Sequence, residues 1–235
     1  MNFRKKNIVA KLLILVSVTL VIVSCSTKKN NFVNRKYHNT TAKYNGYFNG
    51  NESLKAGIKK LEENHKDDFS EIIPVFKTGD LAKNQTIHPY MNKAIEKGSI
   101  VIQRHSMNIR GKEHNKWIDD NYFMIGKSYF YKGEFDEAIK TFNYIKETYK
   151  RNPLKYEAAL WLARCFSEKK DYVAAEMELD QMQTDRKFPE KLDDELAVIL
   201  ADFYLKQENY ILALDELNTA TKHIKKRKKK TRFYF

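Results

Sequence analysis

Residues that interrupt helices are scarce in this sequence. Only four prolines and eight glycines occur among its 235 residues, whereas 31% of the residues are charged. A β-sandwich or β-barrel needs turn residues at short intervals, so a chain this poor in them is expected to be helical. The hydrophobic share of 42% is typical of a globular chain and suffices for one sizeable core. The composition therefore predicts an all-α protein.

Cysteine is also scarce, since only Cys25 and Cys165 occur. Two cysteines cannot build the framework of disulfides that holds many small secreted domains together. Cys165 lies within an apolar helical stretch, so we expect it to pack in the core. Cys25 instead directly follows an apolar segment near the N-terminus.

The sequence lacks a recognisable catalytic or metal-binding motif. Its six histidines show no paired spacing on one helix face, and no cysteine cluster accompanies them. Gly126-Lys127-Ser128 resembles the end of a phosphate-binding loop, but Asn121 stands where that motif needs its first glycine. No convergent acid, base or nucleophile is visible. We therefore predict a protein that is not an enzyme and that uses no metal, cofactor or small-molecule substrate.

The N-terminus has the layout of a signal peptide. Basic residues precede an apolar run from Leu12 to Val23, which at about 1.5 Å per residue is too short for a hydrocarbon core of about 30 Å. Residues 22–25, Ile-Val-Ser-Cys, resemble the lipobox of bacterial lipoproteins, in which the cysteine is lipidated and becomes the mature N-terminus. The alternative is an ordinary signal peptide that happens to contain a cysteine.

The resemblance to a lipoprotein leader implies a location as well. Residues 1–24 would be removed, lipidated Cys25 would anchor the protein, and residues 25–36 would form a polar tether. Ser26 replaces the aspartate that commonly retains lipoproteins in the inner membrane. We therefore expect a lipid-anchored protein on the periplasmic face of the outer membrane.

Positive charge is concentrated at the two ends of the chain. The formal net charge is +13, yet the leader and the run from Lys222 to Arg232 contain most of the excess, and the rest is nearly neutral. The C-terminal run could bind anionic lipid head groups or nucleic acid, or it could be a solvated helix end followed by a linker. Export would keep the protein away from nucleic acid, so no nucleic-acid partner is expected.

An internal repeat organises the second half of the chain. In similar segments from Ile125, Leu162 and Leu200, a small residue is followed three positions later by an aromatic residue and nine positions after that by an alanine. These positions are Gly126, Tyr129 and Ala138, then Ala163, Phe166 and Ala175, then Ala201, Tyr204 and Ala213. The pattern resembles the tetratricopeptide repeat. Small residues would allow close approach of the two helices within a repeat, and aromatic residues would fill the space between repeats.

Each repeat is expected to contain two helices, A and B. The predicted A helices are 118–131, 155–169 and 193–207, and the predicted B helices are 135–149, 172–184 and 210–224. Three such repeats and the basic end would occupy 118–235 of a helical solenoid. Residues 37–117 are expected to be a degenerate helical region with an insertion, including a helix over about 89–108.

A longer resemblance supports the lipoprotein interpretation. The stretch CSTKKNNFVNRKYHNTTAKYNGYFNGNESLKAG from Cys25, the segment IIPVF, and the junction Trp117-Ile118-Asp119-Asp120 resemble the N-terminal region of the SprE/PorW family. Members of that family are periplasmic lipoproteins of the type IX secretion and gliding-motility apparatus. They are much longer, and Arg232-Phe233-Tyr234-Phe235 resembles the start of another helix A, so we expect a truncated chain.

The resemblance implies a scaffold that connects protein partners of the type IX apparatus, and it carries over no catalytic residue. The alternative is a general tetratricopeptide-repeat lipoprotein that assists outer-membrane protein assembly. An enzyme or enzyme subunit would require a pocket with convergent reactive groups, which the sequence does not indicate.

Overall fold

The structure is a computed structural model, and it describes residues 26–81 and 84–223. These residues are mostly helical, which confirms the all-α prediction; the strands among them form one short antiparallel hairpin. In chain order the elements are α2 (Phe32–Thr41), η1 (Ala42–Tyr47), α3 (Phe48–Asn64), η2 (Gln85–Ile87), α4 (His88–His105), β1 (Asn108–Ile109), β2 (Lys112–Glu113), α5 (Ile118–Tyr131), α6 (Phe135–Thr148), α7 (Leu154–Glu168), α8 (Tyr172–Thr184), η3 (Glu190–Leu192), α9 (Asp193–Lys206) and α10 (Tyr210–His223).

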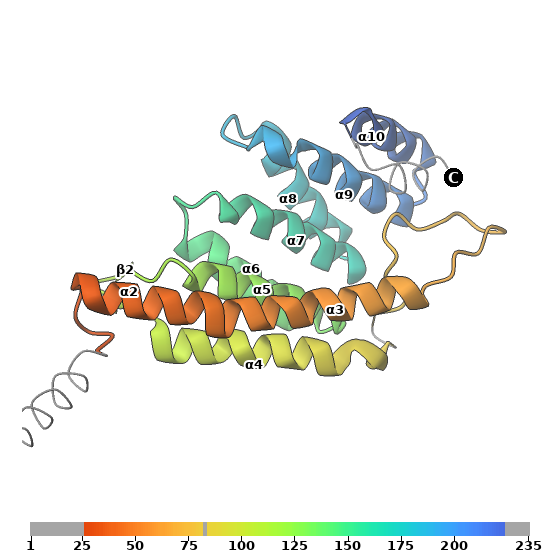
Figure 1. Ribbon diagram of the computed structural model, residues 1–235. Coiled ribbons are helices and arrows are strands. Elements are labelled where there is room, and N and C mark those ends of the chain that lie inside the picture. The colour runs from red at the N-terminus through yellow and green to blue at the C-terminus, as the bar shows by residue number, and fades with distance from the viewer. Residues whose placement is uncertain (1–25, 82–83, 224–235) are drawn as a thin grey trace, which may run out of the picture.

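A long N-terminal helix crosses the front of the molecule in Figure 1 and is formed by α2, η1 and α3 in succession, with α4 beneath it. This helix begins at Phe32, inside the segment that the sequence assigned to a tether. Asn31 caps the helix, because its side-chain oxygen accepts a hydrogen bond of 2.8 Å from the backbone N–H of Asn34. The Asn34 side chain in turn donates to the carbonyl oxygens of Ser26 and Lys29. The polar residues Asn31 and Asn34 therefore stabilise the start of α2.

Glycine allows the long helix to approach its neighbours closely. A Cβ atom on Gly46 would lie 1.8 Å from Val101 Cγ2 of α4, and a Cβ on Gly57 would lie 2.9 Å from Tyr90 Cβ. Because a glycine has no Cβ, the backbones can come nearer than any other residue would permit. The expected degenerate region is therefore a closely packed helical layer against α5.

Three helical hairpins, α5/α6, α7/α8 and α9/α10, follow one another and stack upward in Figure 1. Their bounds agree with the predicted A and B helices to within a residue at each end. α7 lies in the centre of the stack, because it contributes to two hydrophobic cores. Trp161 and Leu162 belong to the first core, which α7 shares with α3 to α6. Leu160 and Ala163 belong to the second core, which α7 shares with α8 and α9. Burial on two faces explains why so much of α7 is apolar.

The three turns between the paired helices share one backbone geometry. Gly133, Lys170 and Glu208 lie at equivalent positions, and each has a positive φ, of 76°, 61° and 60° respectively. The residue after each of them donates its backbone N–H to the carbonyl of Tyr129, Phe166 or Tyr204, at 3.0, 2.9 and 2.9 Å. This is the hydrogen bond that closes a helix ending in a left-handed residue. The hairpins are therefore structural repeats as well as sequence repeats.

Candidate functional site

The residues singled out by the repeat pattern mostly build the interior of the stack. The five alanines are almost fully buried, with Ala138, Ala163, Ala175 and Ala201 at 0% exposure and Ala213 at 1%. A Cβ on Gly126 would lie 2.7 Å from the Phe142 ring, which places Gly126 at a close approach of α5 and α6. These residues position surfaces and do not themselves form a site.

The aromatic residues of the pattern are only partly buried. Tyr129 packs against the first core, Tyr204 packs against the second, and Phe166 packs against both. The repeat pattern did not identify Trp161 as a central core residue. Its ring contacts those of Phe130 and Phe142, with centroid distances of 5.1 and 6.0 Å. Trp161 has no aromatic counterpart in the other repeats, so a search for recurring residues could not find it.

Two residues weighed as chemical groups have packing roles. Cys165 is a buried free cysteine, as expected, and burial raises the pKa of its thiol to about 12. Lys127 lies within α5, where its Nζ is 4.9 Å from the Trp161 ring centroid. The segment that resembles a phosphate-binding loop is therefore a stretch of helix.

Two histidines far apart in the sequence meet in the fold. The Nδ1 atoms of His38 and His105 lie 2.9 Å apart, and burial, followed by the charge of His38, lowers the pKa of His105. Within residues 26–81 and 84–223, no three side chains of histidine, cysteine, aspartate or glutamate gather in a way that could hold a metal ion. The pair links α2 to the end of α4.

Acidic side chains lie in the first turn of two of the A helices. Asp119 and Asp120 lie in the first turn of α5, and Asp193 and Asp194 lie in the first turn of α9. Burial is the main reason that the pKa of Asp120 rises to about 6, and the charges of Asp119 and Glu157 add to it. The positive end of the helix dipole favours a carboxylate here, but burial outweighs it.

Asp120→Asn is expected to stabilise the protein at neutral pH and to change little in acid. The folded pKa of Asp120, about 6, exceeds the ordinary value of 3.8, so folding favours the protonated carboxyl. The carboxyl therefore reduces stability fully above about pH 6 and progressively less as the pH falls towards 3.8. After allowance for solvent screening we expect a gain of about 1 kcal/mol at about pH 8 and almost none at about pH 4, measured by urea unfolding. Asp193→Asn, at an exposed site in the first turn of α9, should show no such gain.

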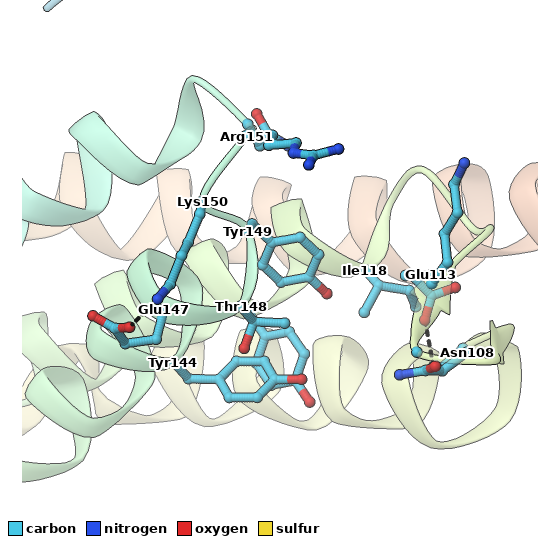
Figure 2. A pocket seen from close by; sticks show the side chains of 14 residues that line it. Asn108, Glu113, Ile118, Tyr144, Glu147, Thr148, Tyr149, Lys150 and Arg151 are labelled. Carbon is cyan, nitrogen blue, oxygen red and sulfur yellow. Dashed lines mark hydrogen bonds and ion pairs between the residues drawn. The ribbon is translucent and has the colours of Figure 1, made fainter.

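A tyrosine-lined hollow lies where the strand hairpin faces the end of α6 (Figure 2). Its volume is about 610 Å³, and Tyr122 of α5, Tyr144 of α6 and Tyr149 form one wall. The ring centroids of Tyr122 and Tyr144 lie 4.5 Å apart, and those of Tyr144 and Tyr149 lie 6.3 Å apart. Burial, followed by the neighbouring Tyr144, raises the pKa of Tyr122 to about 12 and raises that of Tyr149 as well. The hydroxyls of Tyr122 and Tyr149 therefore remain protonated at neutral pH.

The opposite wall of the hollow is held in place by Glu113. Its carboxylate accepts hydrogen bonds from Ser106 Oγ at 2.6 Å and from the backbone N–H groups of Met107 and Asn115 at 2.8 Å each. Antiparallel pairing of Asn108 with Glu113 adds backbone support. Figure 2 shows Glu113 and Ile118 across the hollow from Tyr149. This wall is pre-organised, so a ligand would bind it without a large ordering cost.

Charged side chains surround the rim of the hollow. Lys112, Lys150 and Arg151 contribute cations, and Lys150 is paired with Glu147 at 2.9 Å. Asn152 donates a hydrogen bond to Asp119 and accepts one of 3.0 Å from the backbone of Leu154, which fixes the loop between α6 and α7. Aromatic faces, neutral hydroxyls and a mixed charged rim together suit contacts with a protein surface or peptide. The repeat pattern did not indicate this site, because Tyr144 and Tyr149 lie outside the recurring positions.

No family model matches the chain, and no curated protein matches it either. Lipidation at Cys25 and the basic run after His223 fall outside the described residues. No helix in the described ranges is long and apolar enough to cross a membrane.

Proposed function

We propose that this protein is a scaffold of tetratricopeptide-repeat type that binds other proteins. The tyrosine-lined hollow is the observation that carries the proposal. Tyrosine and arginine are enriched at the residues that dominate protein–protein binding energy, and tyrosine offers a large contact area with few rotatable bonds. The hollow combines three tyrosines with Arg151 on a fixed backbone. A partner side chain that enters it would bury aromatic surface on several sides.

The repeated hairpins support the assignment to the tetratricopeptide-repeat type. Each pairs two helices through the same left-handed turn, and the small residues at their crossings are buried. Stacks of this kind present long surfaces whose shape follows from small rotations between repeats, and proteins commonly use such surfaces for binding. The tyrosine-lined hollow lies at the joint between the first hairpin and the second, where such a surface would continue.

The location and partners rest on the sequence. The motif that ends at Cys25 supports a lipid anchor on the periplasmic face of the outer membrane, and the resemblance to the SprE/PorW family supports partners in the type IX secretion and gliding-motility apparatus. The alternative is a general lipoprotein that assists outer-membrane protein assembly. We propose no catalytic role, no cofactor and no nucleic-acid partner.

Affinity purification with a Tyr144→Ala variant tests this function. The full chain would be tagged at its C-terminus and purified from the native envelope, and mass spectrometry would identify co-purifying proteins and the N-terminal lipopeptide. Tyr144 is 43% exposed, so its truncation should lower recovery of partners roughly tenfold without unfolding the chain. Tyr44→Ala is the matched control, because Tyr44 is 57% exposed and does not line the hollow.

The outcomes separate the parts of the proposal. Type IX subunits and an acylated Cys25 peptide would support the whole assignment. Recovery of barrel-assembly subunits would leave the lipoprotein scaffold and overturn the family assignment. Equal recovery by the two tyrosine variants would show that the hollow is not the binding surface. An unmodified cysteine peptide would overturn the lipid anchor.

A further inference from the structure

The insertion between α3 and α4 folds back onto the helical hairpins. In Figure 1 it leaves the end of α3, and its returning limb runs beside the ends of α7 and α9 before it reaches α4. Its base is held by Asp67, whose carboxylate lies 3.0 Å from His65 Nε2 and 3.7 Å from Lys77 Nζ. These contacts bring the two ends of residues 65–77 together, so the segment between them forms a closed loop.

Phe76 attaches this loop to α7. The Phe76 ring lies with its centroid 4.0 Å from the guanidinium carbon of Arg164, and the rings of Trp161 and Phe130 lie 4.3 and 4.7 Å from the same atom. Arg164 is only 5% exposed, and its positive charge partly offsets the rise that burial causes in the pKa of Tyr131. We call the surface formed by Phe130, Tyr131, Trp161 and Arg164 the Arg164 surface. Phe76 covers it.

Cationic residues at equivalent positions on neighbouring repeats lie over the tryptophan of this surface. Arg164 directly follows the small residue Ala163, just as Lys127 directly follows Gly126 on α5. Lys127 and Arg164 both lie over the Trp161 ring, with distances of 4.9 and 4.3 Å to its centroid. The surface therefore spans two A helices, which is the arrangement that a repeat protein offers to an elongated ligand.

The loop is bound to the hairpins by one side only. Val75 is 6% exposed and Phe76 packs against the second core, whereas Ile72 is 57% exposed and Phe69 is 72% exposed. Such a contact is easy to exchange, because a guanidinium is stable either against an aromatic face or in water. Another segment with the same chemistry could therefore replace the loop without breaking either hydrophobic core.

We propose that residues 72–77 are an internal ligand of the Arg164 surface, and that the surface is a second binding site for a partner peptide in which aliphatic residues precede a phenylalanine. This inference rests on the proposed scaffold function and deepens it. The bound loop itself defines the chemistry of the ligand: Ile72, Ile73 and Val75 lead to an aromatic ring that stacks on Arg164. Because the loop is part of the chain, it competes at a high effective concentration and keeps the site closed to weak ligands.

Peptide binding to the full chain in detergent micelles tests this proposal. The probe is a fluorescent peptide with the sequence of residues 68–80, DFSEIIPVFKTGD. Phe76→Ala in the protein should uncover the surface and lower the dissociation constant of the probe roughly tenfold relative to the unsubstituted protein. Phe69→Ala is the matched control, because it removes the same kind of side chain at a 72% exposed position of the same insertion, outside residues 72–77, and should leave the constant unchanged. A probe with alanine in place of the phenylalanine that corresponds to Phe76 should not bind any of these proteins.

A second measurement needs no destabilising variant. Excess probe added to the unsubstituted protein should increase hydrogen exchange of residues 72–77, because the loop is displaced. Weak, equal binding to all variants together with unchanged exchange would overturn the internal-ligand proposal, even if partners still co-purify and the scaffold function stands. Strong binding of the probe by the Phe76→Ala protein, without any partner recovered from the envelope, would support the surface and count against the scaffold function.

Discussion

Trp161→Ala is expected to lower the free energy of unfolding by about 4 kcal/mol, because truncation of a buried tryptophan removes its contacts and leaves a cavity. Trp161 is 5% exposed and lies among the rings of Phe130, Tyr131 and Phe142, at centroid distances of 5.1, 5.9 and 6.0 Å. The Phe142 ring is stacked on it and the other two meet it at an edge, and such pairs add to the energy of burial. The side chains around Trp161 come from three helices, so local repacking cannot refill the space.

Urea unfolding followed by circular dichroism would measure this loss. Tryptophan fluorescence is unsuitable, because only two tryptophans occur and the variant removes one of them. Trp117→Ala is the control, since Trp117 is only partly buried and its ring packs against that of Tyr47, at a centroid distance of 5.2 Å. A Trp161→Ala loss no larger than the Trp117→Ala loss would contradict the central position of Trp161 between the first two hairpins.

Gly46→Ala is expected to lower the free energy of unfolding by about 2 kcal/mol. Alanine favours a helix by about 1 kcal/mol over glycine, so a glycine at an ordinary helical site would become more stable when replaced. Here the new Cβ would lie 1.8 Å from Val101 Cγ2 and 3.3 Å from Val101 Cβ. A valine in a helix has one strongly preferred rotamer, so it cannot turn away at little cost. The two helices must separate, and overpacking of this kind costs about 1–3 kcal/mol or more.

A double-mutant cycle would verify the contact. Thermal unfolding of Gly46→Ala should show a melting temperature lower by roughly 4–8 °C, and Val101→Ala should recover part of that loss when the two changes are combined. Asn45→Ala, at the exposed position next to Gly46, should leave the melting temperature almost unchanged. Additive effects of the two substitutions would mean that Gly46 and Val101 do not limit the approach of these helices.

Local patterns predicted the three hairpins well. Helix bounds follow from the spacing of apolar residues and from the residues that start and end helices, and both are encoded over a few positions. Ala138, Ala175 and Ala213 recur at one place in each repeat and are buried in the structure. The start of the long N-terminal helix was harder to predict, because Asn31 and Asn34 are polar residues that serve equally well in a tether or in a helix cap.

The candidate sites could not be found by the same means. Tyr144 and Tyr149 are individually ordinary, and they form a hollow only because the strand hairpin faces the end of α6. Phe76 meets Arg164 across a long separation in the sequence, and neither residue belongs to a recognised motif. Such contacts depend on how complete helices pack, and no local spacing records that packing.

The sequence by itself determined the helical class, the repeating hairpins and the small residues at their crossings, because helix formation and helix pairing follow a short period that is written in consecutive residues. Only the tertiary structure decided where the tyrosines gather and which surface the insertion covers. These features depend on the angles between packed helices and on the close approach that Gly46 and Gly126 permit. The repeats define the scaffold, and the packing of the less regular segments against them creates its candidate binding surfaces.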